Sequence, residues 1–226
     1  MMSKKEEILA ELNQIGKLAL REVHAGTEEY QIWATENLDE MVDELIAKGP
    51  NHPAYQDERL PYWAEIWPSS LALAEYVQSA PEITAESTVL ELGCGPGVAG
   101  LAAHRARRVT VSDYEIPALQ LSRVNWLENL GREPAAEFMD WREPRLELAA
   151  DVLLAADVAY EKRFFVPLIN TFKTLLKPGG VILLSEPGRS VAVDFFECMQ
   201  HSEFEAEQVA VKHGIDIWRF RRIESK

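Results

Sequence analysis

After Pro61 the sequence alternates between short apolar runs and longer stretches with helical spacing, and this alternation constrains the fold more than any other feature. Strands linked by crossover helices form a parallel sheet that is covered on both faces. We therefore predict an α/β fold for this part of the chain. The predicted strands are residues 88–92, 109–112, 136–139, 151–155 and 181–185, and the predicted helices are residues 98–107, 117–130 and 164–176.

The end of the chain has a different pattern. Residues 204–211 and 215–222 are strand-like runs joined by the short Lys212-His213-Gly214 turn, which predicts an antiparallel hairpin. Added to the five strands above, the hairpin gives a seven-stranded, Rossmann-like sheet that is mostly parallel, with helices on both faces.

The first 60 residues carry a helical pattern. Ile8, Leu12, Ile15 and Ala19 recur at steps of three and four, which predicts a helix over residues 8–20, and a second apolar stripe runs from residue 38 to residue 46. The turn-rich stretch at residues 49–53 follows. We predict an N-terminal helical extension over residues 1–60 and a second domain over residues 61–226.

The glycine-rich turn that follows the first predicted strand points to a ligand site. Residues 89–100 read as a strand, a turn with glycine at 93, 95 and 97, and the start of a helix. Glycines are needed where a ligand approaches backbone N–H groups closely, and ligands of open α/β sheets bind beyond the carboxyl ends of the strands. The segment 95–100 also matches the G-x-G-x-x-G pattern, so an NAD(P)-binding oxidoreductase is one interpretation.

Two further strand ends carry residues suited to a nucleotide. Asp113 lies 20 residues beyond Gly93, where a carboxylate can accept hydrogen bonds from both ribose hydroxyls. Asp140 and Trp141 follow the third strand and offer an acceptor for the adenine amino group beside a flat indole ring. Asp113 suits any nucleotide cofactor and does not separate one class from another, whereas the Asp140-Trp141 pair indicates an adenine pocket.

Four segments resemble a known family. Residues 91–97, E-L-G-C-G-P-G, resemble the first motif of class I S-adenosylmethionine methyltransferases. Residues 61–68 and 155–160 resemble the seven-β-strand methyltransferases grouped with the nicotinamide N-methyltransferase-like proteins. The P-Y-W-A run at 61–64, together with E-P-G-R at 186–189, looks most like the lysine methyltransferases of the electron-transfer flavoprotein β subunit and their bacterial relatives.

The resemblance implies an activity and a set of site residues. It implies an S-adenosyl-L-methionine-dependent N-methyltransferase that modifies a lysine of a protein, such as an electron-transfer flavoprotein-like protein. A small nicotinamide-like amine is the alternative acceptor. One departure bears on the substrate, because Lys162 and Arg163 follow Glu161 where the flavoprotein enzyme has acidic residues. The implied catalytic residues are Asp157 and Tyr160, and the implied cofactor residues are Trp67, Glu91, Gly93, Gly95, Asp113, Tyr114, Asp140, Trp141 and Ala156.

Net charge, cysteine content and the absence of long apolar runs bear on the binding partners, on metal binding and on the location of the protein. The 226 residues include 23 Lys and Arg against 37 Asp and Glu, a net charge of −14, which disfavours nucleic acid and anionic membranes and favours a cationic partner. Cys94 and Cys198 have neither a second cysteine nor a histidine at zinc-ligand spacing, so we predict no metal. With no long apolar run, and no apolar leader pattern at its start, the chain is predicted to be cytoplasmic.

Overall fold

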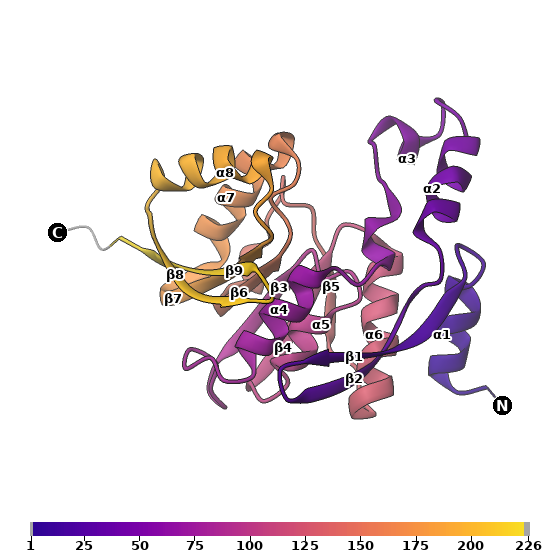
Figure 1. Ribbon diagram of the computed structural model, residues 1–226, viewed down its shortest axis with the longest axis horizontal. Coiled ribbons are helices and arrows are strands. Elements are labelled where there is room, and N and C mark those ends of the chain that lie inside the picture. The colour runs from indigo at the N-terminus through magenta and orange to yellow at the C-terminus, as the bar shows by residue number, and fades with distance from the viewer. Residues whose placement is uncertain (1, 224–226) are drawn as a thin grey trace.

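The computed structural model describes residues 2–223, and within them the main feature is one seven-stranded sheet (Figure 1). Strands β3 to β7 pair in parallel, whereas β9 is antiparallel to β7 and β8 is antiparallel to β9. The predicted α/β sheet and its antiparallel C-terminal hairpin are confirmed. In the order β5-β4-β3-β6-β7-β9-β8, the strands span Ala135–Phe138, Arg108–Asp113, Thr88–Leu92, Ala150–Ala156, Leu176–Glu186, Ile215–Arg222 and Phe204–Lys212.

Helices cover both faces of this sheet, as predicted. Alternate residues of β6 enter two different cores: Leu154 packs with α4 and α5, whereas its neighbour Leu153 packs with α7 and α8. Because side chains alternate along a strand, a strand that is apolar at consecutive positions must be covered on both sides. The helices of this region are α4 (Pro68–Val77), α5 (Val98–Ala102), α6 (Ile116–Leu130), α7 (Phe165–Leu175) and α8 (Ser190–Gln200).

Some boundaries differ from the sequence-based predictions. Helix α5 ends at Ala102, short of the predicted residue 107. Arg105 instead donates hydrogen bonds to the carbonyl oxygens of Val77, the last residue of α4, and of Ala80 in the turn that follows. Strand β7 begins at Leu176 rather than at residue 181. Helices α4 and α8 were not predicted.

The N-terminal extension is only partly helical, so the prediction of a helix over residues 8–20 is wrong. Helix α1 (Lys4–Leu12) stops where the Asn13 side chain binds the Leu9 carbonyl oxygen at 2.8 Å and the Leu18 amide at 3.0 Å. Strand β1 (Leu18–Ala25) then pairs with β2 (Glu28–Thr35) as an antiparallel hairpin. The remaining elements of the extension are α2 (Leu38–Ala47) and α3 (Pro53–Gln56), and the 3-10 turn η1 (Pro61–Ala64) follows it.

The extension lies along the helices of the main body. Helix α1 and strand β2 contact α6, β1 contacts α4, and α2 contacts η1. The chain then continues from η1 into α4 of the main body.

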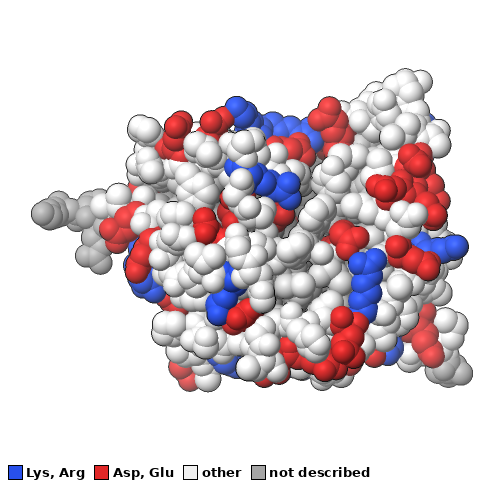
Figure 2. All heavy atoms as spheres, in the orientation of Figure 1, with Lys and Arg blue, Asp and Glu red and all other residues white. Residues whose placement is uncertain are grey.

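Among residues 2–223 no helix combines the length and the apolar character that crossing a membrane requires. Acidic side chains are spread over the face shown in Figure 2, with Lys and Arg among them.

Candidate active site

A pocket lies at the carboxyl ends of β3, β4 and β6. The chain runs from β3 outward to β4 and β5 and then returns to β6 on the other side of β3, so the connections diverge at this edge. Such a switch point is where open α/β sheets bind ligands. Every predicted site residue lines this one pocket, namely Trp67, Glu91, Gly93, Gly95, Asp113, Tyr114, Asp140, Trp141, Ala156, Asp157 and Tyr160.

The glycine turn forms the floor of the pocket, and its glycines are required sterically. Gly93 and Gly95 have φ values of 63° and 48°, in the left-handed region that L side chains rarely adopt. A Cβ on Gly93 would lie 3.1 Å from the Trp141 ring, and one on Gly95 would lie 3.1 Å from the Trp63 carbonyl oxygen. The turn is therefore packed tightly against both neighbours and presents bare backbone to the pocket.

Glu91 packs so closely against Gly100, the third glycine of the G-x-G-x-x-G pattern, that only glycine fits there. Its side chain is buried, and Oε2 accepts a hydrogen bond from the Gly100 amide at 3.0 Å, where a Cβ would lie only 2.5 Å away. Burial raises the pKa of Glu91 to about 8, because a charged carboxylate is poorly solvated there. Gly100 therefore serves the packing of α5 against β3, and Glu91 is protonated at neutral pH.

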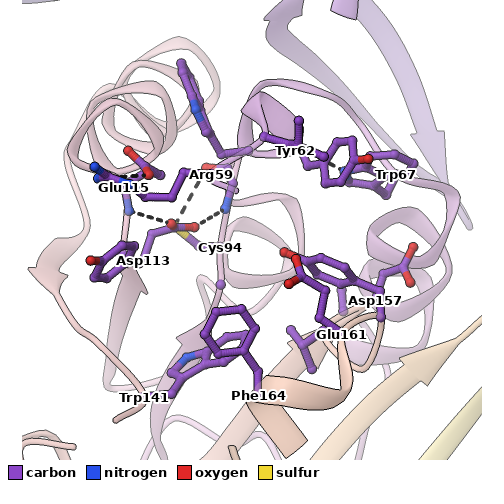
Figure 3. Close-up of a pocket in the computed structure, with 18 of the residues that line it drawn as sticks. Arg59, Tyr62, Trp67, Cys94, Asp113, Glu115, Trp141, Asp157, Glu161 and Phe164 are labelled. Atoms are coloured by element: carbon purple, nitrogen blue, oxygen red, sulfur yellow. Dashed lines mark hydrogen bonds and ion pairs between the residues drawn. The ribbon is translucent and has the colours of Figure 1, made fainter. Parts of the chain in front are cut away.

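Asp113 buttresses the glycine turn. Its Oδ2 accepts a hydrogen bond from the Gly95 amide at 3.0 Å, and its Oδ1 accepts one from the Glu115 amide at 2.9 Å (Figure 3). Burial raises its pKa, although these backbone donors act in the opposite direction. Each oxygen retains a further lone pair, so Asp113 can bind the turn and still accept a hydrogen bond from a ligand.

Asp140 is held by an arginine that sequence analysis did not assign to the site. Arg142 Nε lies 2.9 Å from both carboxylate oxygens of Asp140, and its Nη2 lies 2.6 Å from Oδ2. Burial opposes ionisation, but these hydrogen bonds hold the pKa of Asp140 below its ordinary value. The Arg142 guanidinium also lies 5.4 Å from the centre of the Tyr114 ring, and that of Arg59 lies 5.6 Å from it.

Three aromatic rings line the opposite end of the pocket. Tyr62 packs edge-on against Trp67, with a centroid separation of 5.6 Å (Figure 3), and edge-on against Tyr160, with a separation of 6.1 Å. Trp67 Nε1 donates to the Tyr62 carbonyl oxygen at 2.9 Å, which fixes the indole ring. Burial raises the pKa of Tyr160, so its phenol stays neutral. Tyr62 was missed by sequence analysis, although it lies within the P-Y-W-A run.

Asp157 occupies the turn directly after β6. Its φ of 55° is left-handed, which is uncommon for a residue other than glycine, and its amide donates to the Ser185 carbonyl oxygen at 3.0 Å. The side chain is only 6% exposed, and Arg189 forms a bidentate ion pair with it. The structure thus places Asp157 at the pocket, as predicted, and adds a partner from the start of α8.

A segment before η1 completes the rim. Residues 57–60 line the pocket, and Arg163 holds this segment through the Asp57 carbonyl oxygen at 3.0 Å while pairing with Glu161 at 2.6 Å. Arg59 pairs with Glu115 at 3.5 Å across the same rim. Sequence analysis did not assign residues 57–60 to the site, because nothing in their local pattern marks them.

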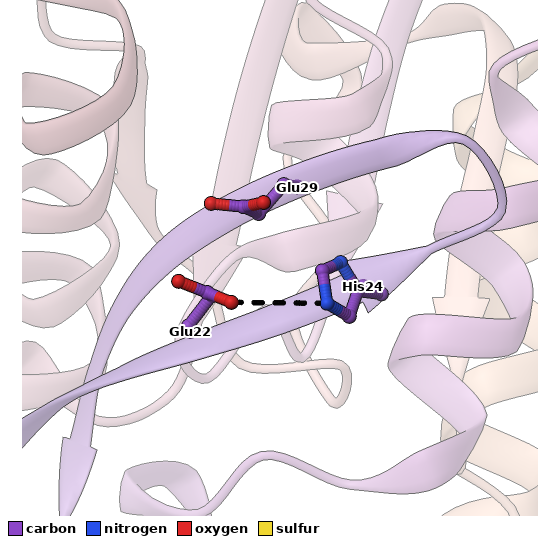
Figure 4. A group of neighbouring side chains, drawn as sticks. All are labelled: Glu22, His24 and Glu29. Carbon is purple, nitrogen blue, oxygen red and sulfur yellow. Dashed lines mark ion pairs between the residues drawn. The ribbon is translucent and has the colours of Figure 1, made fainter.

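The β1–β2 hairpin carries a separate group of side chains. Glu22, His24 and Glu29 bring their ligand-type atoms within 4.8 Å of one another (Figure 4), and His24 Nε2 lies 3.8 Å from Glu22. All three side chains are exposed, and none of them lines the pocket. The group is therefore separate from the site described above.

Comparisons with known sequences identify relatives. A family model described as lysine methyltransferase matches residues 55–202. Protein N-lysine methyltransferase METTL21A of Xenopus tropicalis is 29% identical over 164 residues, which cover 70% of this chain and 76% of the relative. EEF1A lysine methyltransferase 3 of Mus musculus is 30% identical, covering 74% of this chain and 75% of that one. The electron transfer flavoprotein beta subunit lysine methyltransferase of Danio rerio is 31% identical over 58% of this chain and 51% of its own length.

Solved structures share the fold at low sequence identity. A ribosomal protein L11 methylase from Lactobacillus delbrueckii aligns with a TM-score of 0.55 and 15% identity, over 69% of this chain and 79% of that one. The N-methyltransferase NodS from Bradyrhizobium japonicum aligns with a TM-score of 0.52 and 17% identity, over 77% and 90%. These findings decide against the oxidoreductase interpretation of residues 95–100. The chain belongs to the lysine methyltransferase family and is an S-adenosylmethionine-dependent methyltransferase.

Proposed function

We propose that this enzyme methylates a lysine side chain of a protein substrate in the cytoplasm. The observation that carries the proposal is the acceptor end of the pocket, where Asp157 lies beside the rings of Tyr62, Trp67 and Tyr160. Relatives named for protein substrates support a protein acceptor. Both cysteines are free thiols, which is usual in a reducing compartment.

The residues at the other end of the pocket suit the cofactor. The glycine turn leaves no room for a Cβ, and Asp113 retains lone pairs that can accept hydrogen bonds from ribose hydroxyls. Asp140 offers an acceptor for an adenine amino group, with Trp141 beside it. When bound, S-adenosylmethionine supplies an electrophilic methyl group on a sulfonium.

The acceptor end can orient the substrate amine and stabilise the positive charge of the sulfonium or of the methylated amine. Aromatic faces stabilise a sulfonium or an alkylated ammonium, as a cation placed over a ring is attracted by its electrons. Asp157 can accept a hydrogen bond from the substrate amine and hold its nitrogen in line for attack. Partial enclosure by the residues 57–60 segment limits water near the reacting atoms. This scheme requires no metal.

The cations that follow Glu161 do not make the rim a free basic surface. Arg163 pairs with Glu161, and Lys162 forms an ion pair with Asp194 of α8. The net charge of −14 supports a substrate with a basic segment around its target lysine. An electron-transfer flavoprotein-like protein remains within the proposal, on the strength of the resemblance at residues 61–64 and 186–189.

The test has a binding step and an acceptor step. Calorimetry should show S-adenosylhomocysteine binding in the micromolar range, about −8 kcal/mol, and no heat with reduced nicotinamide dinucleotide. The enzyme is then incubated with labelled S-adenosylmethionine and a lysate of its own source, and the label is located by mass spectrometry. We expect it on a lysine side chain of a protein. Label found only among small molecules would contradict the proposal and favour a small amine acceptor.

A further inference from the structure

Asp157 alone poses an electrostatic problem for the reaction. A lysine amine has an ordinary pKa of about 10.4 and must lose a proton before its nitrogen can attack. A nearby carboxylate stabilises the ammonium form and so raises the pKa of that amine. A carboxylate that orients the acceptor therefore also opposes its deprotonation, unless another charge offsets it.

Arg189 is placed to supply that charge. Its Nε and Nη2 each lie 2.8 Å from one carboxylate oxygen of Asp157. The Arg189 side chain is 39% exposed, whereas that of Asp157 is 6% exposed, so the pair extends from the buried end of β6 toward solvent. The guanidinium carbon also lies 6.0 Å from the centre of the ring of Trp67, which lines the acceptor end of the pocket.

The loop that carries Arg189 is itself anchored. The buried carboxylate of Glu186, at the end of β7, accepts hydrogen bonds from the Gly188 amide at 2.6 Å and from the Arg189 amide at 2.9 Å. Gly188 has a φ of 87°, which lets the chain turn sharply before α8 begins. The backbone of Arg189 is thus held from the same sheet edge that holds Asp157.

We propose that Arg189 is a positioning residue for methyl transfer, an inference that rests on the function proposed above. Its fork uses two of the lone pairs of Asp157 and leaves the others to orient the acceptor amine. Its positive charge offsets that of the carboxylate, so the acceptor ammonium passes its proton to water nearer to neutral pH. The nitrogen lone pair then forms the new N–C bond as the S–C bond pair returns to sulfur.

The other ionisable groups near the pair do not replace Arg189. Glu186 lies at the end of β7, and its carboxylate oxygens accept hydrogen bonds from the Gly188 and Arg189 amides. Tyr62 approaches from η1, and Tyr160 and Glu161 lie on the loop after β6. Burial raises the pKa of Tyr160, and the charge of Glu161 is already paired with Arg163. Within the described part of the chain, Arg189 is the cation that is hydrogen-bonded to Asp157.

The experiment compares pH profiles. The probe is tritiated S-adenosylmethionine with a lysate of the enzyme's own source, and the rate of labelling of the lysine side chains in its proteins is measured from about pH 6.5 to about pH 9.5. Arg189→Gln removes the positive charge. Arg189→Lys retains the charge but cannot form the two parallel hydrogen bonds that the guanidinium makes with Asp157. The control is Arg145→Gln, which changes a similarly exposed ion-paired arginine that does not line the pocket.

We expect Arg189→Gln to move the acid limb of the profile upward by roughly one to two pH units. Labelling near neutral pH should then fall about tenfold or more, with recovery at high pH. Arg189→Lys should show a smaller displacement, the control should superimpose on the wild type, and S-adenosylhomocysteine affinity should stay within about twofold in all variants, which also verifies folding.

Two results would overturn the role of Arg189 while leaving the proposed function standing. An equal loss of rate at every pH, with an unmoved profile, would show that Arg189 is merely structural. A higher labelling rate in Arg189→Gln would show that Arg189 keeps Asp157 from binding the acceptor amine. If the wild type binds S-adenosylhomocysteine but labels no protein lysine at any pH, the proposed function itself fails, and this inference fails with it.

Discussion

The two ends of the pocket are held together by different kinds of contact. At the cofactor end, the carboxyl groups that hold the glycine turn are buried and bind backbone amides, as Glu91 does with Gly100 and Asp113 with Gly95, whereas the partly exposed Asp140 pairs with Arg142. At the acceptor end, carboxylates pair with arginine side chains, as Asp157 does with Arg189. Backbone amides are fixed by the fold, whereas a partly exposed arginine can exchange partners with a ligand. The glycine turn of the cofactor end is therefore preorganised, and the Asp157–Arg189 pair at the acceptor end is adjustable.

This comparison makes its strongest prediction at Asp157. Asp157→Ala should lower turnover by two orders of magnitude or more, about 2.7 kcal/mol of transition-state stabilisation, because the acceptor amine loses its orienting group. S-adenosylhomocysteine binding should change little. Steady-state rates and calorimetry measure both quantities, with Asp194→Ala as a control that removes an exposed carboxylate on α8. If the variant lost cofactor affinity but kept its kcat, Asp157 would be shown to bind the cofactor and not to orient the acceptor amine.

Asp113 tests the preorganised end. Asp113→Ala removes both the proposed ribose acceptor and the partner of the Gly95 amide. Hydrogen bonds to a charged group contribute roughly 1.5–3 kcal/mol each, so S-adenosylhomocysteine affinity should fall at least about tenfold. Thermal melting would verify that the variant is folded. An affinity equal to that of the wild type would mean that Asp113 supports the turn without contacting the cofactor.

Glu91 should make stability depend on pH. Folding raises its pKa from an ordinary 4.5 to about 8, so the folded state binds the extra proton and stability from this group falls as pH rises between these values. The loss approaches about 1 kcal/mol per pH unit, a few degrees in Tm. Melting curves near pH 6 and pH 8 should converge in Glu91→Gln. The exposed Glu86→Gln serves as the control, and an equal slope in all three proteins would contradict the burial argument.

The smallest effect is expected at Arg163, on the rim. Its contacts to Glu161 and to the Asp57 carbonyl oxygen are partly exposed, and such pairs contribute about 0–1 kcal/mol. Arg163→Gln should therefore raise KM for the protein substrate by no more than about fivefold, with cofactor affinity unchanged. Kinetics with a labelled methyl donor measure this. A large loss of cofactor affinity would show that residues 57–60 belong to the cofactor end.

The sequence was most informative where function follows from local pattern. The strands and the glycine turn are contiguous segments, and the carboxyl ends of parallel strands meet at one edge, so the sequence alone predicts that Gly93, Asp113 and Asp157 lie together. The hairpin of β1 and β2 does not follow from local pattern, because a strand depends on a partner elsewhere in the chain. Ile15 and Ala19 happen to continue the helical spacing of α1, whereas strand formation depends on pairing with β2, where Tyr30 and Ile32 alternate inward.

Only the tertiary structure shows which carboxylates the arginines in and beside the pocket pair with. Arg59, Arg163 and Arg189 lie on loops and helix ends whose local sequence carries no signal for their partners, and long side chains reach those partners only after the elements have packed. The sequence alone therefore determined which strand ends meet and where a ligand can approach the bare backbone of the glycine turn. The pairing of each carboxylate depends on distances across separate elements, and only packing sets those distances.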